Sequence, residues 1–255
     1  MSISPITVAA RHEPALGKAH ARRLREIYRS AGWPCQDLLE IELLAAGMLD
    51  RVHSAAGHET LRVTDAGVQL LATALASNRA AFTAHEALVE QVALEMCRAG
   101  RVAWRGLSLR AQVPNEDSAA ELRWCIAKPD VFSIRNTSKA NYVDPVVHEV
   151  KVRRADLLGD LRKPAKGEAY RQMARECWYV LAEGIGEAAD VPEDYGVMME
   201  RDGVLDVLRP APRRTLRLPF ATWMALARAT PEPAVESTQQ ALGDEHGDPP
   251  TGRAG

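Results

Sequence analysis

The stretch PVVHEVKVRRADLLGDLRK, residues 145–163, joins a strand-like run to a basic segment and sets the interpretation of the whole chain. Its first eight residues are mostly β-branched, which predicts a β-strand. Glu149 and Lys151 stand two apart in that run, so strand alternation places both charges on one face and Val150 on the other. Burying an unpaired carboxylate or ammonium is costly, so this face must be hydrated, paired or bound to a metal ion.

A second carboxylate belongs to the preceding predicted strand. Asp130 follows Pro129, and the loop NTSKANYVD, residues 136–144, leads into the next strand. A hairpin formed by these strands would place Asp130 beside Glu149. Two carboxylates that close repel each other unless a divalent cation joins them, and their oxygens suit Mg²⁺ or Mn²⁺. The alternative is a structural ion pair with Lys151 on a half-exposed strand.

The order Pro129-Asp130 followed by Glu149-Val150-Lys151 resembles the PD-(D/E)xK nuclease superfamily. The resemblance implies a restriction-endonuclease-like α/β fold, with a mixed sheet flanked by helices. It also implies Mg²⁺-dependent hydrolysis of DNA phosphodiester bonds. Asp130 and Glu149 would hold the metal ion, while Lys151 would orient or deprotonate the attacking water and stabilise the charge on the phosphate.

A further resemblance covers residues 125–215. The run HEVKVRRADLLGDLRKPAKGEAYRQMARECWYVLA, followed by VPEDYGVMME, is similar to the MmcB-like group of DNA-repair proteins. The matching positions are Glu149, Lys151, Asp156, Asp160, Lys163, Tyr170 and Cys177. Trp178 departs from that group, which tends to have aspartate there. The resemblance implies a role in DNA repair or processing.

Many members of the nuclease superfamily place an acidic ligand on the first helix of the core. This chain offers Glu86 and Glu90 in the predicted helix at residues 85–100. Glu86 borders the apolar face of that helix and is therefore better placed than Glu90 to complete the metal shell. For either residue, the alternative is a hydrated surface glutamate.

Residues 151–175 are locally basic, with eight lysine or arginine residues against three acidic ones. A surface of this kind suits a partner that carries phosphates, although charged faces are usually only hydrated. The candidate DNA contacts, where phosphates would pass the predicted active strand, are Arg153, Arg154, Lys163 and Lys166. Such contacts would make affinity fall with salt.

The chain divides into three predicted parts. Residues 17–77 contain two helices, two short strands and a third helix, an order that resembles the closing half of winged-helix domains. Such modules contact DNA or join copies of a chain as a homodimer. A connector at residues 78–83 leads to the predicted nuclease-like domain at 84–230, with strand-like runs that include 101–113 and 121–135. The acidic tail at 231–255, rich in proline and glycine, is predicted to be disordered.

Composition excludes several other classes of protein. The 255 residues are 46% hydrophobic and 26% charged, and no run of 18 apolar residues predicts a membrane span. The N-terminus lacks the pattern of a secretion signal, which indicates a cytoplasmic protein. The four cysteines lie far apart without a CxxC pair, which favours reduced thiols over disulfides or a zinc site.

The preferred hypothesis is thus a Mg²⁺- or Mn²⁺-dependent DNA nuclease without a membrane partner. Two alternatives remain. One is a DNA-binding or regulatory protein whose nuclease-like fold does not cut, and the other is a structural protein that binds partners through its winged-helix-like module.

Overall fold

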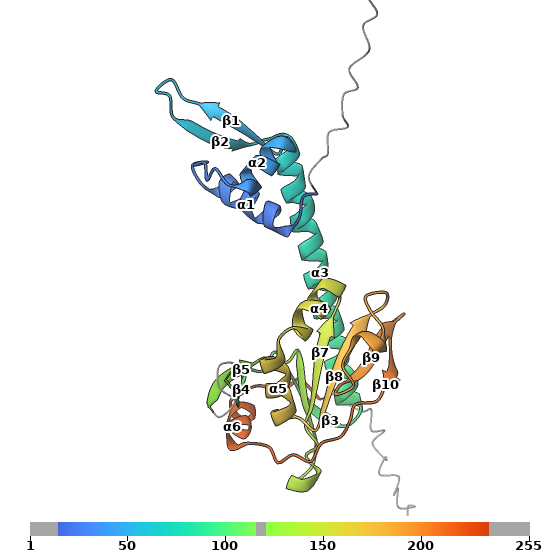
Figure 1. Cartoon of the computed structure of the whole chain (residues 1–255). Coiled ribbons are helices and arrows are strands. Elements are labelled where there is room, and N and C mark those ends of the chain that lie inside the picture. Colours follow the sequence, from blue (N-terminus) through green and yellow to red (C-terminus); the bar gives the residue numbers. More distant parts are fainter. Residues whose placement is uncertain (1–14, 116–120, 235–255) are drawn as a thin grey trace, which may run out of the picture. The chain divides into compact units, whose positions relative to one another are not determined.

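The computed structural model describes residues 15–115 and 121–234 (Figure 1). The chain divides into two compact units between Phe82 and Thr83. Within the described ranges, no helix has both the length and the apolar character needed to cross a membrane. All four cysteines are free thiols, in agreement with the prediction. The predicted disordered tail lies outside the described residues from 235 onward.

The first unit is a small helix–hairpin module, and the predicted order of its elements is confirmed. These elements are α1 (Lys18–Arg29), α2 (Leu38–Ala45), β1 (Leu49–His53), β2 (Glu59–Val63) and the start of α3 (Asp65–Arg98). Asp37 caps α2 by accepting a hydrogen bond from the Glu40 N–H at 3.0 Å. The core of this unit consists of Leu24, Ile27, Leu43, Leu49, Leu61 and Leu71.

Helix α3 corrects one prediction. The connector expected at residues 78–83 is helical, because α3 runs without a break from Asp65 to Arg98. Between Gly67 and Gly100 the sequence contains neither glycine nor proline, so nothing in it interrupts the helix.

The second unit is built on a mixed sheet, as predicted, and this sheet has six strands. Its strands are β3 (Arg101–Arg105), β6 (Val131–Arg135), β7 (Val146–Lys151), β8 (Glu176–Ala182), β9 (Gly196–Arg201) and β10 (Val204–Arg209). They lie in the order β10-β9-β8-β7-β6-β3. Strands β7, β8 and β9 are parallel to their neighbours in that group, whereas the β10–β9, β7–β6 and β6–β3 pairs are antiparallel.

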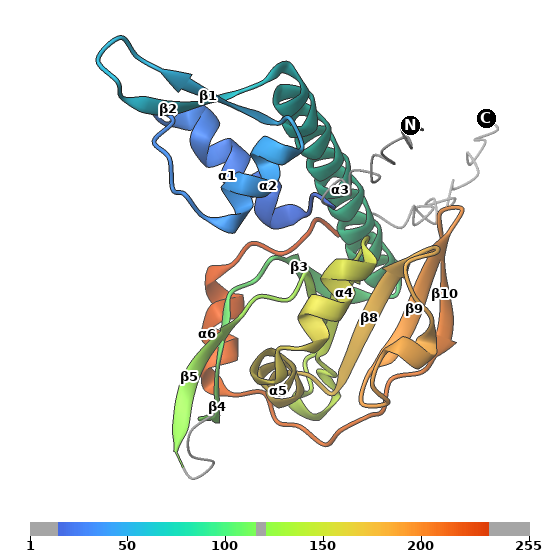
Figure 2. The same ribbon diagram turned by 45° about the horizontal axis from the view of Figure 1, so that its top comes forward.

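Two expected strands are each divided in the structure. The run 101–113 breaks at Gly106, which has a positive φ of 58°, and the run 121–135 breaks at Lys128-Pro129. The released halves, β4 (Leu109–Pro114) and β5 (Leu122–Ala127), pair with each other as a separate two-stranded sheet. This hairpin lies beside α5 (Figure 2).

The second unit also contains three further helices. They are α4 (Arg154–Leu161), α5 (Pro164–Met173) and α6 (Phe220–Arg228), with short 3₁₀ turns at Ala140–Tyr142 and Ala188–Asp190. The segment interpreted as merely basic is thus largely the helix α4. Proline at the first position of α5 suits a helix start, since its missing N–H would have no partner there.

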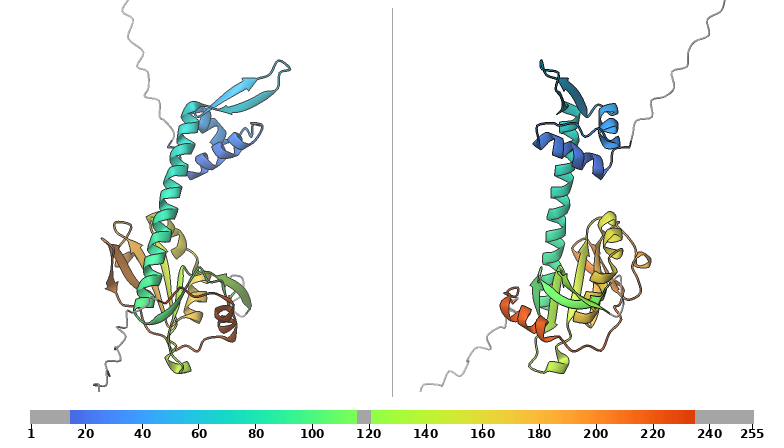
Figure 3. Two further views of the ribbon diagram at one scale, coloured as in Figure 1. Left: turned by 180° about the vertical axis from the view of Figure 1, so that it is seen from behind. Right: turned by 60° about the vertical axis from the view of Figure 1, so that its left-hand side comes forward.

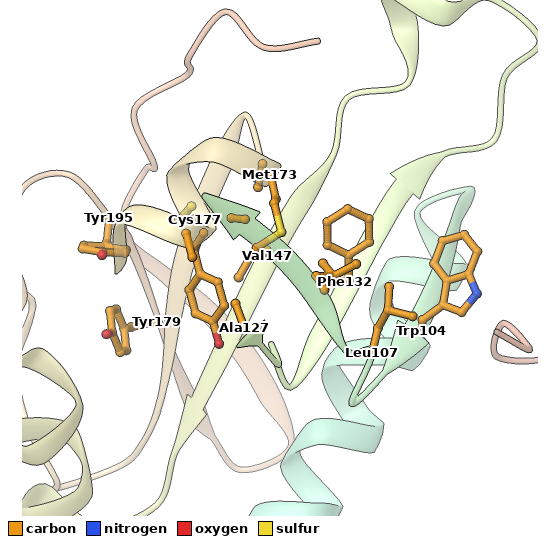
Figure 4. Packing of buried hydrophobic residues seen from close by; sticks show 14 of the residues in the cluster. Trp104, Leu107, Ala127, Phe132, Val147, Met173, Cys177, Tyr179 and Tyr195 are labelled. Carbon is orange, nitrogen blue, oxygen red and sulfur yellow. The ribbon is translucent and has the colours of Figure 1, made fainter. Parts of the chain in front are cut away.

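Two apolar clusters lie on opposite faces of the sheet. On one face, Phe132 and Val147 pack with Met173 of α5 and Tyr179 of β8 (Figure 4). On the other face, Val150 and its strand neighbours pack against an apolar stripe of α3, the arrangement seen from behind in Figure 3. That stripe consists of Leu88, Val89, Val92 and Ala93. Strand β7 is therefore covered on both sides, and all six of its residues are buried.

Candidate active site

The pairing of β6 with β7 brings the two predicted carboxylates together. The antiparallel register sets Val131 opposite His148, so Asp130, one residue earlier, comes opposite Glu149. The Asp130 carboxylate accepts a hydrogen bond from the Val150 N–H at 2.7 Å. The hairpin expected from the sequence is confirmed, and it positions Asp130 at the start of β6 and Glu149 near the end of β7.

Glu149 and Lys151 lie on the same face of β7, as alternation predicted. Their exposed fractions are only 4% and 8%. The Lys151 ammonium donates to Glu149 Oε1 at 2.5 Å, so these two buried charges are paired with each other. Two more donors reach this carboxylate: the Lys166 ammonium contacts Oε1 at 2.5 Å, and the Tyr170 hydroxyl donates to Oε2 at 2.7 Å.

Asp160 of α4 is a third carboxylate at this place and, like Glu149, it is buried. It accepts from the Lys166 ammonium at 2.8 Å and from the Tyr179 hydroxyl at 3.1 Å, and Lys151 Nζ lies 3.6 Å away. Burial acts to raise the pKa of Asp160, but the charges of Lys151 and Lys166 outweigh it and lower the pKa. Glu149 and Asp160 thus share two ammonium groups, and the four charges compensate one another.

Local sequence explains how α4 and α5 supply these groups. Lys166 and Tyr170 are four residues apart on α5, so they lie on one face of that helix. Burial tends to lower the pKa of Lys166, but the carboxylates of Glu149 and Asp160 raise it, so the side chain stays charged. Burial raises the pKa of Tyr170 and, after it, so does the negative charge of Glu149, so the phenol is a neutral hydrogen-bond donor.

The sequence alone did not identify this part of the cluster as a site, since Asp160 and Tyr170 were only positions of the family resemblance. In the structure, the Tyr170 ring is buried in the main core while its hydroxyl contacts Glu149. Lys166 was predicted to contact DNA. Its ammonium instead lies between Glu149 and Asp160, and contact with DNA stays a prediction.

His85 of α3 contacts Asp130, and it lies one position before the glutamate favoured from sequence. His85 Nε2 lies 3.4 Å from Asp130 Oδ2, and its Nδ1 lies 3.2 Å from Glu86 Oε1. The Glu86 side chain is 52% exposed. Glu86 thus reaches Asp130 only through the His85 ring, and its place in a metal shell stays a prediction. His85 precedes Leu88, Val89 and Val92 by three, four and seven residues, so the apolar spacing could have identified it.

Two of the predicted ligands, Asp130 and Glu149, are suited to a magnesium or manganese ion. Burial raises the pKa of Asp130, and the negative charge of Glu149 raises it further. A divalent cation between the two carboxylates would relieve that repulsion, and Mg²⁺ commonly uses one or two carboxylates together with water and substrate phosphate. Among residues 15–115 and 121–234, however, no group of three or more His, Cys, Asp or Glu side chains could hold a metal ion. The fit therefore depends on Asp130 and Glu149 alone.

The other predicted DNA-binding residues surround α4 and α5. Arg153 is the N-cap of α4, and Lys163 is the N-cap of α5 and is exposed. Lys163 and Lys166 line a small cavity of about 160 Å³ beside the buried cluster. Arg154 binds the Asp190 carboxylate with two hydrogen bonds of 2.8 and 3.0 Å, so its charge is already neutralised.

His148 is packed in the protein interior and takes no part in the cluster. Its ring is 1% exposed and stacks on Trp178, with ring centres 6.5 Å apart. Burial lowers the pKa of His148 to about 3, so the ring is neutral at physiological pH. The stack also gives the tryptophan at position 178 a structural role.

Comparison with known proteins adds a distant structural likeness. No protein-family model matches the chain, and no curated protein sequence matches it. The SPO1766 protein of unknown function from Silicibacter pomeroyi is similar in structure, with a TM-score of 0.38 and 19% sequence identity. The match covers 54% of this chain and 77% of that protein. A likeness this distant does not inform the function.

Proposed function

We propose that the chain is a Mg²⁺- or Mn²⁺-dependent nuclease that hydrolyses phosphodiester bonds in DNA. The observation that carries the proposal is the convergence of Asp130, Glu149 and Lys151 where β6 begins and β7 ends. Two carboxylates and an ammonium in one place are the groups that metal-assisted phosphodiester hydrolysis requires. The resemblance of this sequence order to the PD-(D/E)xK nucleases supports the same reaction and the proposed role in DNA repair or processing.

Each residue has a distinct part in this proposal. Asp130 and Glu149 would hold the metal ion, which supplies a water of lowered pKa and stabilises negative charge on the phosphate. Lys151 is close enough to Glu149 to orient the attacking water, and its charge stabilises the phosphate in the transition state. The Tyr170 hydroxyl holds Glu149 in place through Oε2.

Lys166 links the site to its substrate in this account. Its ammonium occupies Glu149 Oε1 together with that of Lys151, so it must release Glu149 before that oxygen can face a cation. Asp160 already binds Lys166 and can retain it. A DNA phosphate arriving at the adjacent cavity offers the ammonium a second anionic partner.

Conversion of supercoiled plasmid to the nicked form tests the proposed reaction. The purified full chain is incubated with plasmid and Mg²⁺, Mn²⁺, Ca²⁺ or a chelator. The proposal requires nicking with Mg²⁺ or Mn²⁺ and none with the chelator. Equal nicking with and without the chelator, or none in any condition, contradicts it.

Lys163, the exposed lysine at the N-terminus of α5, gives a prediction for DNA affinity. Lys163→Gln is expected to weaken DNA binding and to reduce the slope of log affinity against log salt concentration by about one, because one phosphate contact is lost. Arg154→Gln is expected to change the slope by much less, since Asp190 already neutralises that guanidinium. Gel-shift titrations in Ca²⁺ across a salt series measure both slopes.

Arg201→Gln is the matched control for the salt series. Arg201 is a half-exposed arginine at the end of β9, two strands from β7, and it pairs with Glu183 at 3.2 Å. Its slope should equal that of the unmodified protein. If the Lys163→Gln protein also has the slope of the unmodified protein, Lys163 does not contact DNA phosphates.

A second candidate is a DNA-binding protein with this fold that does not cut. The observation that favours it is the saturation of Glu149, whose two carboxylate oxygens accept from Lys151, Lys166 and Tyr170. If the ammonium of Lys166 never leaves, the carboxylate is a structural centre. DNA binding without nicking in any divalent cation is the result that this candidate predicts.

A further inference from the structure

A separate cluster of arginines lies at the opposite end of the central strands. Asp130 precedes β6 and Glu149 lies near the end of β7, whereas Arg135 ends β6 and Asp144 precedes β7. The segment after β10 adds Arg213 to this end. These groups line a cavity of about 550 Å³, which is thus separated from the candidate active site by the length of the strands.

One carboxylate organises the cluster. Asp144 Oδ2 lies 2.6 Å from Arg213 and 3.6 Å from Arg135, and its Oδ1 lies 3.3 Å from Arg175. Arg101 donates to the Asp144 carbonyl. The backbone of Asp144 has a positive φ of 50°, a conformation that non-glycine residues seldom adopt and that its arginine partners hold in place.

Positive charge exceeds negative charge in this cluster. Three guanidinium groups pair with the Asp144 carboxylate, and Arg101 adds a fourth through the Asp144 carbonyl. The second carboxylate, Glu176, contacts Arg213 at 3.1 Å. Burial lowers the pKa of Arg101 more than the two carboxylates raise it. The side chains of Arg135 and Arg213 remain 56% and 60% exposed, so their unused N–H groups are open to an anion from solvent.

The arginine cavity continues into a more apolar one. A second cavity of about 590 Å³ shares Asn141, Asp144, Arg175 and Thr215 with the first. Beyond that shared wall it is lined by Leu216, Leu218 and the indole of Trp223 from α6, which is 39% exposed. Tyr142, also exposed, lines the arginine side. A flat aromatic surface beside a cluster of guanidinium groups suits a ligand with a phosphate and a ring that stacks.

We infer that the two adjoining cavities bind a nucleotide, with its phosphate on Arg135 and Arg213 and its base against Trp223. The ligand is either a free nucleoside monophosphate or the phosphorylated end of a nucleic-acid strand, which present the same chemistry. This inference does not depend on the proposed nuclease reaction. The site uses none of the residues of that reaction and needs no metal ion.

Titration of the full chain with thymidine 5′-monophosphate in a chelator tests the inference. Inorganic phosphate and thymidine are titrated alongside it, and calorimetry measures each affinity. The chelator prevents metal-dependent binding at Asp130 and Glu149, so failure here is distinct from failure of the nuclease proposal. The nucleotide is expected to bind at least tenfold more tightly than either of its parts, since guanidinium contacts and stacking act together.

Substitutions test whether Arg135 binds the phosphate and Trp223 contacts the base. Arg135→Gln is expected to weaken nucleotide binding about tenfold, the equivalent of one lost charge-assisted hydrogen bond. Trp223→Leu is expected to weaken nucleotide binding similarly while leaving the affinity for inorganic phosphate unchanged. Arg201→Gln serves as the exposed-arginine control and should bind normally. Arg213→Gln replaces Arg135→Gln if thermal unfolding shows that the latter is misfolded.

Single-stranded oligonucleotides with a 5′-phosphate or a 5′-hydroxyl distinguish the two sources. Tighter binding of the phosphorylated strand, lost in Arg135→Gln, identifies a strand end as the ligand. Binding of the mononucleotide alone identifies a free nucleotide. The inference is overturned if the nucleotide binds no more tightly than inorganic phosphate, or if folded Arg135→Gln and Arg213→Gln proteins bind it normally.

Discussion

Replacing Glu149 by glutamine is expected to reduce Mg²⁺-dependent nicking of supercoiled DNA by about 10³-fold. The substitution preserves the size of the side chain and an oxygen for the Tyr170 hydroxyl, but it removes the charge that would bind the metal ion. It also leaves the buried ammonium of Lys151 without its nearest anion. The nicking rate of the purified variant, measured at equal concentration with the unmodified protein, gives the loss.

Glu200→Gln is the matched control for that assay. Glu200 lies on β9 of the same sheet and accepts a hydrogen bond from the Gly203 N–H at 2.9 Å, apart from the cluster. Its nicking rate should be unchanged. A Glu149→Gln protein that is folded and keeps more than about a tenth of the activity would exclude Glu149 as an essential ligand, since one lost electrostatic contact in such sites costs 10² or more.

Asp160→Ala is expected to lower the free energy of unfolding by about 3–5 kcal/mol at neutral pH. The side chain is buried, and its loss leaves the Lys166 ammonium and the Tyr179 hydroxyl each short of a partner. Removing one member of a buried charge network is costly because the remaining charges stay buried without compensation. Urea denaturation followed by circular dichroism measures the difference.

The pH dependence of that difference follows from the lowered pKa of Asp160. Burial opposes the lowering, but Lys151 and Lys166 outweigh it in the folded protein. The carboxylate therefore stabilises the fold fully above the pKa of an unfolded aspartate, about 3.9, and loses this effect as the pH falls through its lower folded value. The stability gap between the two proteins should be full at pH 7 and should shrink below about pH 4.

Asp156→Ala separates this effect from a general loss of negative charge. Asp156 is exposed in the first turn of the same helix, where a carboxylate contributes below about 1 kcal/mol. A similar loss of stability in both variants would mean that the contacts of Asp160 with the lysines have little energetic weight.

The centre of the site was predictable because it depends on local rules. Alternation along β7 placed Glu149 and Lys151 on one face, and the expected hairpin placed Asp130 beside them. A mixed sheet also followed from the alternation of strand-like and helical segments. In each case the interacting residues are either on one strand or on two strands that are consecutive in the sheet.

The remainder of the cluster could not be predicted from the sequence, because it depends on tertiary packing. Lys166 and Asp160 come from two helices that turn back over β7, and their sequence shows only a basic segment with scattered acids. Spacing on α5 places Lys166 and Tyr170 on one face but does not say that the face meets Glu149. On α3, both His85 and Glu86 border the apolar face, and only the folded structure shows that the His85 ring contacts both Asp130 and Glu86.

The distinction between local sequence rules and tertiary packing also explains the divided strands. Gly106 and Pro129 mark breaks that were visible in the sequence, but the runs around them are apolar enough to be interpreted as continuous. The break before Asp130 frees β5 to pair with β4 and starts β6 at the site. Proline there ends one strand, and the residue after it opens the next with its side chain at the candidate metal position.

Titration of the full chain with Mn²⁺ tests the central claim most directly, because it asks whether Asp130 and Glu149 form a cation site at all. Calorimetry is run on the unmodified protein and on Asp130→Asn, which keeps the shape of the side chain and an oxygen for the Val150 N–H. The account predicts a saturable heat with the unmodified protein that is lost in the variant. No heat with either protein, or the same heat with both, would contradict it.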